Sequence, residues 1–320
     1  MPTFPRPTFP FEYEVDEEIA ALRAHRAARG IPGKHAQELM VGTWNIANLG
    51  AQQRTSKDFA LIAEILGGFD VIAVQECRSN TQDLLQIVHA MGEGWGYVMS
   101  DAAGNDERMV FIFDRRKLSL LEEIGEIAFP PSQLKHVKLV SAPKEKFIAF
   151  DRNPYLASFQ LGERMSVQLV NVHLFYGDEK PAALRRRAIE TAAVARWCDV
   201  RRKSKYSGAR EIIALGDFNM PKAKRDGGNI VYEALTEKEL ILPGHSSEIG
   251  SSIASDNHYD QIAIYKSTAE GFAVQTGIFD YDKVIFKGLW QARSEAQFNA
   301  WLRYYISDHR PMWMRLKRNT

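Results

Sequence analysis

The sequence YYISDHRPMWMRL, residues Tyr304–Leu316, places a Ser-Asp-His triplet directly before an apolar run. The run Met312–Leu316 has the composition of a buried strand, and a proline separates it from the triplet. By itself, the triplet fits a polar turn before a proline as well as it fits a catalytic turn. The interpretation therefore depends on whether polar residues also stand at the ends of the other strands.

Other apolar runs in the chain also begin or end in polar residues. The predicted strands that end in polar side chains are residues 40–49, 70–76, 167–173 and 211–219. The predicted strand 260–265 begins with an acid, and the predicted strand 108–113 follows one. If strands of the two kinds run antiparallel, seven polar residues gather at one end of the sheets. These residues are Glu76, His173, Asp217, Asn219, Asp260, Asp308 and His309.

The order of the predicted elements indicates the fold class. Helices are expected over residues 15–29, 55–66, 81–91 and 181–205, where apolar residues recur on one side. Several successive strands have no helix between them, which favours mixed sheets in an α/β protein. Residues 130–149 are expected to form a loop and an edge strand. Because the polar positions run from Asn45 to His309, we expect one domain over residues 39–320, after an N-terminal extension, residues 1–38, with one helix.

Composition limits the class of protein. The chain has 320 residues, of which 45% are hydrophobic and 25% charged, with a net charge of +1. These values are ordinary for a globular protein and give no overall basic signal for nucleic acid. No apolar run reaches membrane-spanning length, and the proline-rich start does not resemble a secretory signal. Cys77 and Cys198 fit a reducing compartment, so we expect a cytoplasmic protein without a membrane span.

The polar residue types suit metal-assisted hydrolysis of a phosphoester. Mg²⁺ prefers oxygen ligands, so Glu76 is the expected main ligand, with Asn45 and Asp308 beside it and Mn²⁺ as a substitute ion. Asp217 can take a proton from the attacking water, and the Asn219 amide can orient the water or the phosphate.

Two histidines can stabilise the charge that builds on the phosphate in the transition state. Each needs an acid behind it, and we expect Asp260 to serve His309 and Glu107 to serve His173. Taken singly, each acid also fits a helix cap or a turn, and each histidine fits a structural role. Their joint occurrence at the ends of apolar strands favours a catalytic site.

Six short motifs resemble, in this order, the signature of the endonuclease/exonuclease/phosphatase superfamily. They are Thr43-Trp44-Asn45, Val74-Gln75-Glu76, Asn171-Val172-His173, Gly216-Asp217-Phe218-Asn219, Tyr259-Asp260-Gln261-Ile262 and Ser307-Asp308-His309-Arg310-Pro311. The resemblance covers residues 41–316. It implies a four-layer sandwich of two packed mixed β-sheets flanked by helices, and a Mg²⁺-dependent phosphoesterase site. The family roles fall on Asn45, Glu76, His173, Asp217, Asn219, Asp260, Asp308 and His309.

Three positions distinguish branches of this superfamily. His173 resembles the deoxyribonuclease I branch, since the abasic-site endonucleases usually have Asn there. Glu107 and Arg152 also resemble that branch, and Arg152 would then contact a substrate phosphate; the alternative is a surface cation. Residues 258–261, His-Tyr-Asp-Gln, differ from the Trp-Cys-Asp-Arg motif of inositol polyphosphate 5-phosphatases. Because the chain lacks the secretion signal and disulfides of deoxyribonuclease I, we do not expect a digestive enzyme.

We expect a Mg²⁺-dependent phosphodiester hydrolase that acts on DNA as an endonuclease. One alternative is a phosphodiesterase or phosphatase that acts on a lipid, such as sphingomyelin, or on a small phosphorylated molecule. Another is a non-catalytic binding member of the same fold. The arginines at 185–187 and 201–203 could follow a phosphate backbone, but we interpret them as a solvated helix face. Aromatic residues between the last two strands could stack on bases but are interpreted as core: Phe279, Tyr281, Trp290, Phe298, Trp301 and Tyr304.

Overall fold

The first β-sheet contains the strand that follows the Ser-Asp-His turn. The computed structural model describes residues 3–163, 165–209, 211–221, 229–245, 247, 249–255 and 257–319. In this sheet the strand order is β11-β12-β1-β2-β4-β3. Only β1 and β2 pair in parallel among these neighbours. The bounds are β1 (Glu38–Leu49), β2 (Val71–Arg78), β3 (Trp95–Met99), β4 (Glu107–Asp114), β11 (Phe272–Ile278) and β12 (Met312–Arg318).

The second sheet has the order β5-β6-β7-β8-β10-β9. Here β7 and β8 run parallel and the other neighbouring pairs run antiparallel. The bounds are β5 (Leu118–Glu126), β6 (Tyr155–Leu161), β7 (Met165–His173), β8 (Glu211–Asp217), β9 (Leu240–Ile241) and β10 (Asp260–Tyr265). Both sheets are mixed, as expected from the sequence.

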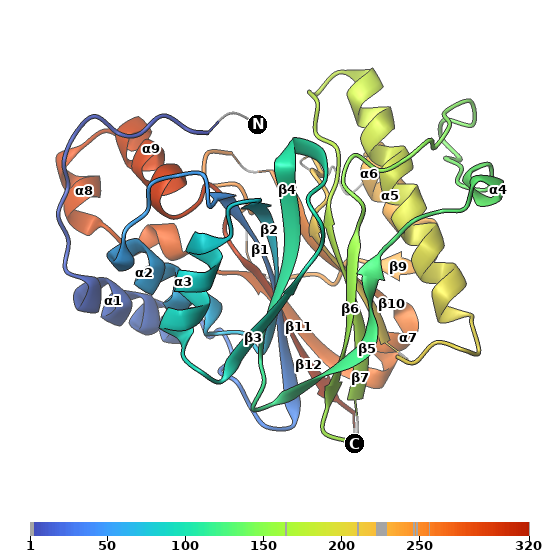
Figure 1. Cartoon of the computed structure of the whole chain (residues 1–320), viewed down its shortest axis with the longest axis horizontal. Coiled ribbons are helices and arrows are strands. Elements are labelled where there is room, and N and C mark those ends of the chain that lie inside the picture. The colour runs from blue at the N-terminus through green and yellow to red at the C-terminus, as the bar shows by residue number, and fades with distance from the viewer. Residues whose placement is uncertain are drawn as a thin grey trace.

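Helices cover the outer face of each sheet (Figure 1). On the first sheet lie α1 (Val15–Ala28), α2 (Ser56–Leu66), α3 (Gln82–Met91), α8 (Lys287–Ala292) and α9 (Glu295–Tyr305). On the second lie α4 (Pro131–Leu134), α5 (Pro181–Arg202) and α6 (Ile230–Thr236), while α7 (Lys266–Gly271) links β10 to β11. Short 3-10 turns occur at Gly104–Asp106 and Tyr281–Lys283. In the described part of the chain, no helix has the length and apolarity needed to cross a membrane.

Three apolar clusters hold these four layers together. One cluster lies between the two sheets and includes Val41, Phe111, Leu169 and Met314. A second fills the space between the first sheet and its helices, and a third does so for the second sheet. Burial of apolar surface on both faces explains why the central strands read as continuous apolar runs. The four-layer sandwich expected from the sequence is therefore confirmed.

The predicted elements are found where a strong local signal exists. Thr55 and Asp58 form the expected capping box at the start of α2. The edge strand expected within residues 130–149 is wrong, since these residues hold only α4 and irregular chain. The edge strands of this sheet are β5, which comes earlier in the chain, and β9, which comes later. The sequence of β5 does not alternate regularly between apolar and polar residues, because acidic residues are mixed in and a bulge lies between Leu120 and Ile124. It therefore lacks the pattern typical of a strand.

Candidate active site

Three neighbouring strands of the second sheet each place one polar residue at the same edge. His173 at the end of β7 is paired with Asp217 at the end of the parallel strand β8. Asp217 is also paired with Asp260 at the start of the antiparallel strand β10. Gly216 allows the close approach of β8 to β7, because it has a φ of +138° and a Cβ there would lie 2.1 Å from the Val172 carbonyl oxygen. The three side chains therefore stand side by side.

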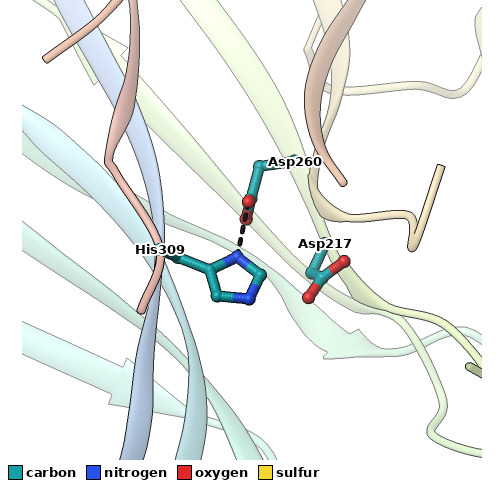
Figure 2. Close-up of side chains that lie close together, drawn as sticks. All are labelled: Asp217, Asp260 and His309. Atoms are coloured by element: carbon teal, nitrogen blue, oxygen red, sulfur yellow. Dashed lines mark hydrogen bonds and ion pairs between the residues drawn. The ribbon is translucent and has the colours of Figure 1, made fainter. Parts of the chain in front are cut away.

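His309 comes from the other sheet and meets this row from the side. Its Nδ1 lies 2.7 Å from Asp260 Oδ2, and Figure 2 shows the imidazole between the carboxylates of Asp260 and Asp217. Its backbone N–H donates to Ser307 Oγ at 3.0 Å. Burial acts to lower the pKa of His309, but the carboxylates of Asp260 and Asp217 raise it well above its ordinary value. The imidazole is thus held in its charged form.

His173 has the acid that the sequence assigns to it. Its Nδ1 lies 2.9 Å from Glu107 Oε2, and its Nε2 lies 3.8 Å from Asp217 Oδ2. Burial acts to raise the pKa of Glu107, but the ion pair with His173 and the nearby charge of Arg152 hold it below its ordinary value. Glu107 is therefore held as the ionised partner behind His173, in the position that Asp260 takes behind His309, although burial raises the pKa of Asp260.

Arg152 lies beneath the site. Its side chain is only 3% exposed, so the interpretation as a surface cation is wrong. Its Nε donates to the His173 carbonyl oxygen at 2.9 Å, and its Nη2 donates to the Leu174 carbonyl oxygen at 3.1 Å. These bonds support the end of β7. The expected contact of Arg152 with a substrate phosphate stays a prediction.

Asn45, Glu76 and Asp308 gather beside the histidines. Asn45 Nδ2 donates to Glu76 Oε1 and to Asp217 Oδ2, both at 3.0 Å. Asn45 Oδ1 is buried and has no hydrogen-bond partner among the described residues. Burial raises the pKa of Asp308, and the nearby negative charge of Glu76 raises it further. A buried amide oxygen without a partner, on a residue whose amide nitrogen is bonded to a carboxylate, fits a hard divalent cation such as Mg²⁺.

Asp217 is held as a carboxylate. Its Oδ1 accepts the Asn219 N–H at 2.8 Å, and Asn219 Nδ2 donates to the Leu174 carbonyl oxygen at 2.8 Å. Burial acts to raise the pKa of Asp217, but the charges of His309 and His173 lower it below its ordinary value. The carboxylate of Asp217 is thus held in the ionised form that a general base must have.

A second group of side chains has the geometry of a metal site. Oxygen or nitrogen atoms of Asp217, Asp260 and His309 all lie within 4.8 Å of one another, so these residues could hold an ion. A metal-bound imidazole must however be neutral. The sequence analysis expects the metal at Asn45, Glu76 and Asp308 instead, and that assignment stays a prediction.

Sequence reasoning missed Arg187, which belongs to a run of arginines expected on a solvated face. That expectation is wrong for Arg187, whose side chain is 0% exposed. Its Nη1 donates to the Asn219 carbonyl oxygen at 2.6 Å. Its Nη2 donates to the carbonyl oxygens of Tyr176 and Asp178 at 2.7 and 2.8 Å. Three consecutive residues of a packed helix cannot all face solvent, so the run of three arginines already indicated that one of them is buried.

The aromatic residues between the last two strands are mostly core, as interpreted from the sequence. Five of the six are buried: Phe279, Tyr281, Phe298, Trp301 and Tyr304. Trp290 differs, with 51% of its surface exposed.

No protein-family model and no curated protein matches the sequence. Solved structures match the fold. Truncated TDP2 of Caenorhabditis elegans superposes with a TM-score of 0.57 at 14% identity, covering 88% of this chain and 97% of that one. An endonuclease/exonuclease/phosphatase family protein of Bacteroides thetaiotaomicron gives 0.55 at 17% identity, covering 87% and 97%. A mannosyl-6-phosphatase of the same organism gives 0.56 at 18% identity, covering 87% and 99%.

The chain has the endonuclease/exonuclease/phosphatase fold. The fold implied by the six motifs is thus confirmed by structures whose sequences are very different. His173, Asp217 and Asp260 of these motifs lie at strand ends of the second sheet, and His309 lies before β12 of the first.

Proposed function

We propose that the chain is a Mg²⁺-dependent phosphoesterase. The observation that carries this proposal is the arrangement of two ion-paired histidines around one carboxylate. His309 with Asp260, and His173 with Glu107, both face Asp217. A binding protein has no need of two imidazoles, each backed by an acid, aimed at a buried carboxylate. The fold is also shared with a protein named as an endonuclease/exonuclease/phosphatase family protein and with one named as a mannosyl-6-phosphatase, which supports the same class of reaction.

Asn45, Glu76 and Asp308 would hold the metal ion. When bound there, Mg²⁺ supplies a Lewis acid that polarises the phosphoryl oxygens. Asn45 would offer Oδ1, because its Nδ2 already donates to Glu76 and Asp217. The same amide thus fixes the distance between the metal ligands and the proposed base.

The remaining residues would carry the hydrolysis. Asp217 takes a proton from water, whose oxygen forms a bond to phosphorus as the ester oxygen leaves. Asn219 holds Asp217 through its N–H, which keeps the carboxylate aimed at the water. His309 presents Nε2–H to the phosphate, because its Nδ1 is bound to Asp260. His173 likewise donates from Nε2, and both N–H donors stabilise the negative charge that develops on the phosphoryl oxygens.

For the substrate, we propose an internal phosphodiester bond of DNA, so that the chain acts as an endonuclease. The support is the His173–Glu107 pair, which resembles the deoxyribonuclease I branch. A lipid or a small phosphorylated molecule is the alternative substrate, and a non-catalytic binding protein is the alternative function. These alternatives predict that the protein hydrolyses different phosphate compounds, or none in the case of a binding protein.

The test is hydrolysis by the purified protein with Mg²⁺ of supercoiled plasmid and of bis(p-nitrophenyl) phosphate. Excess EDTA and His309→Ala should each abolish both reactions, with kcat reduced by at least about 100-fold. His89→Ala is the matched control, since this exposed histidine of α3 lies outside the site. Cleavage of the aryl ester without plasmid nicking would overturn the DNA proposal alone. Absence of both reactions would overturn the phosphodiesterase proposal and leave a phosphatase of small phosphorylated molecules or a binding protein.

A further inference from the structure

Tyr259 stands beside His309 and Tyr176 stands beside Tyr259, and the proposed hydrolysis uses neither tyrosine. The ring centroid of Tyr259 lies 6.0 Å from that of His309, with 36° between the ring planes. The ring of Tyr176 meets the ring of Tyr259 edge-on, at 6.2 Å and 79°. Both tyrosines are half-buried, so neither is closed off inside the core. An aromatic surface therefore continues outward from the imidazole.

Tyr259 is fixed by the turn that carries the proposed base. Its carbonyl oxygen accepts the Phe218 N–H at 3.0 Å, so its backbone is bonded to the residue after Asp217. Its hydroxyl oxygen accepts a hydrogen bond from Asn257 Nδ2 at 2.7 Å. The ring is thus held at both ends and does not have to be ordered when a ligand arrives.

Tyr176 is fixed by the buried arginine of α5. Arg187 donates to the Tyr176 carbonyl oxygen at 2.7 Å, and its guanidinium carbon lies 5.0 Å from the centre of the tyrosine ring. Gly177 has a φ of +67°, which turns the chain so that the same guanidinium also reaches the Asp178 carbonyl oxygen. Because Arg187 also bonds to the Asn219 carbonyl oxygen, this loop and the catalytic turn share one anchor.

We propose that Tyr176 and Tyr259 form a stacking site for a nucleobase attached to the phosphate that is cleaved. The inference rests on the proposed phosphoesterase function and defines the substrate class of the same site. Phenol rings stack on any base, because every base has a planar π-face. In a nucleotide one sugar separates the base from the phosphate. A rigid aromatic surface next to the imidazole that faces the phosphate suits this arrangement.

Two esters that differ only in the base test the proposal. One is thymidine 5′-(p-nitrophenyl phosphate), and the other has the base replaced by hydrogen. The ratio of their kcat/KM values isolates the base and is followed by release of p-nitrophenolate with Mg²⁺. Stacking of one base should favour the thymidine ester by about tenfold in the wild type. Equal kcat/KM values for the two esters would overturn the proposal, whereas absence of turnover of both would refute the phosphoesterase function instead.

Substitutions then assign the preference to the rings. Tyr176→Ala and Tyr259→Ala should each lower the ratio at least threefold, whereas Tyr176→Phe and Tyr259→Phe should keep it, because phenylalanine retains the ring. Tyr206→Ala is the matched control, since Tyr206 is 79% exposed and its ring contacts Lys205. If the alanine variants slow both esters equally, the tyrosines support the fold or the sugar and the proposal is wrong. If the Phe variants lose the ratio, hydroxyl hydrogen bonding replaces stacking as the explanation.

Discussion

At the scale of single residues, the acid behind each histidine decides what the histidine can do. Asp260 holds His309 through Nδ1 at 2.7 Å and keeps it charged. We expect Asp260→Asn to lower kcat by about 100-fold, because a neutral amide stabilises the imidazolium less. Thermal unfolding should show a folded variant, and steady-state kinetics gives the rate. Asp199→Asn, which removes an ion-paired acid on α5, serves as the control. A kcat within threefold of the wild type would contradict the role given to Asp260.

Arg187 acts on the same scale, although it touches no reacting atom. One planar guanidinium bonds to three carbonyl oxygens from two loops, which the point charge of a lysine cannot reproduce. We expect Arg187→Lys to lower kcat/KM at least tenfold, since small displacements of positioned groups have large effects on rate. Arg185→Lys, on the same helix with 44% of its side chain exposed, should have no effect.

Comparing the turnover of Arg187→Lys with its stability shows whether Arg187 positions the site or only stabilises the fold. For Arg187→Lys, urea unfolding should show a loss of about 1–3 kcal/mol, which leaves most molecules folded. Reduced turnover must therefore come from the folded variant. Full turnover by a destabilised variant would show that Arg187 only supports the fold.

Residue types and strand ends were readable from the sequence, but side-chain partners were not. Asp217 and His309 could be chosen because each stands next to an apolar run. The run of three arginines indicates that one of them is buried, but the bond of Arg187 to the Asn219 carbonyl oxygen could not be predicted, because that oxygen lies 32 residues away and belongs to the backbone. The pairing of Tyr176 with Tyr259 has the same cause, since it depends on how a loop and a strand of one sheet meet.

At the scale of elements, β4 is fixed to the chain before β1 by one carboxylate. Asp114 accepts hydrogen bonds from Lys34 Nζ at 2.8 Å and from Arg116 Nε at 2.7 Å. Its burial acts to raise its pKa, but the bonds from Arg116 and Lys34 hold the pKa of Asp114 well below its ordinary value. A carboxylate with a lowered pKa stabilises the fold above about pH 4, and this stability is lost as the pH falls through the folded-state pKa.

We therefore expect Asp114→Asn to cost about 1–2 kcal/mol at pH 7, a modest figure because Arg116 is 66% exposed and partly screened. The difference from the wild type should shrink between about pH 4 and pH 2. Urea unfolding at a series of pH values measures it. Asp101→Asn is the control, since this side chain is 88% exposed. A difference that stays constant with pH would assign the cost to packing.

Helices and strands that carry their own sequence signal could be predicted. Those that form only because they pair with another strand could not. The start of α2 follows from Thr55 and Asp58, which are three residues apart. The strand β11 has buried residues mainly at its second half, and its pairing with β12 is what makes it a strand. Sequence reasoning has no access to that pairing, since β11 and β12 are separated by α8 and α9.

At the scale of the whole molecule, the N-terminal extension packs on the first sheet's helices. Leu22 of α1 is 2% exposed and belongs to the same apolar cluster as Ile62 and Trp301. The Tyr13 hydroxyl donates to Asp58 Oδ1 at 2.8 Å, which ties the extension to the capping box of α2. The division of the chain at residue 38 stays a prediction, and these contacts indicate that the extension shares the core of the larger unit.

The two cysteines offer a test of whether the two halves of the sandwich unfold together. Cys77 lies in the cluster behind the first sheet and Cys198 in the cluster behind the second. Burial raises the pKa of each thiol to about 12, so both are unreactive in the folded protein. The apolar cluster between the sheets contains residues of both, which makes independent opening of either half unfavourable.

We expect both thiols to report one opening free energy, the same within about 1 kcal/mol. The single-thiol variants Cys77→Ala and Cys198→Ala, labelled with an aromatic disulfide reagent at increasing urea, measure the two values separately. Urea unfolding of each variant corrects for the stability lost with the thiol. If Cys198 labels far faster than Cys77 without urea, the half that carries α5 opens alone. Because that half contributes His173, Asp217 and Asp260 while His309 comes from the other, such opening would separate the catalytic groups before the chain unfolds.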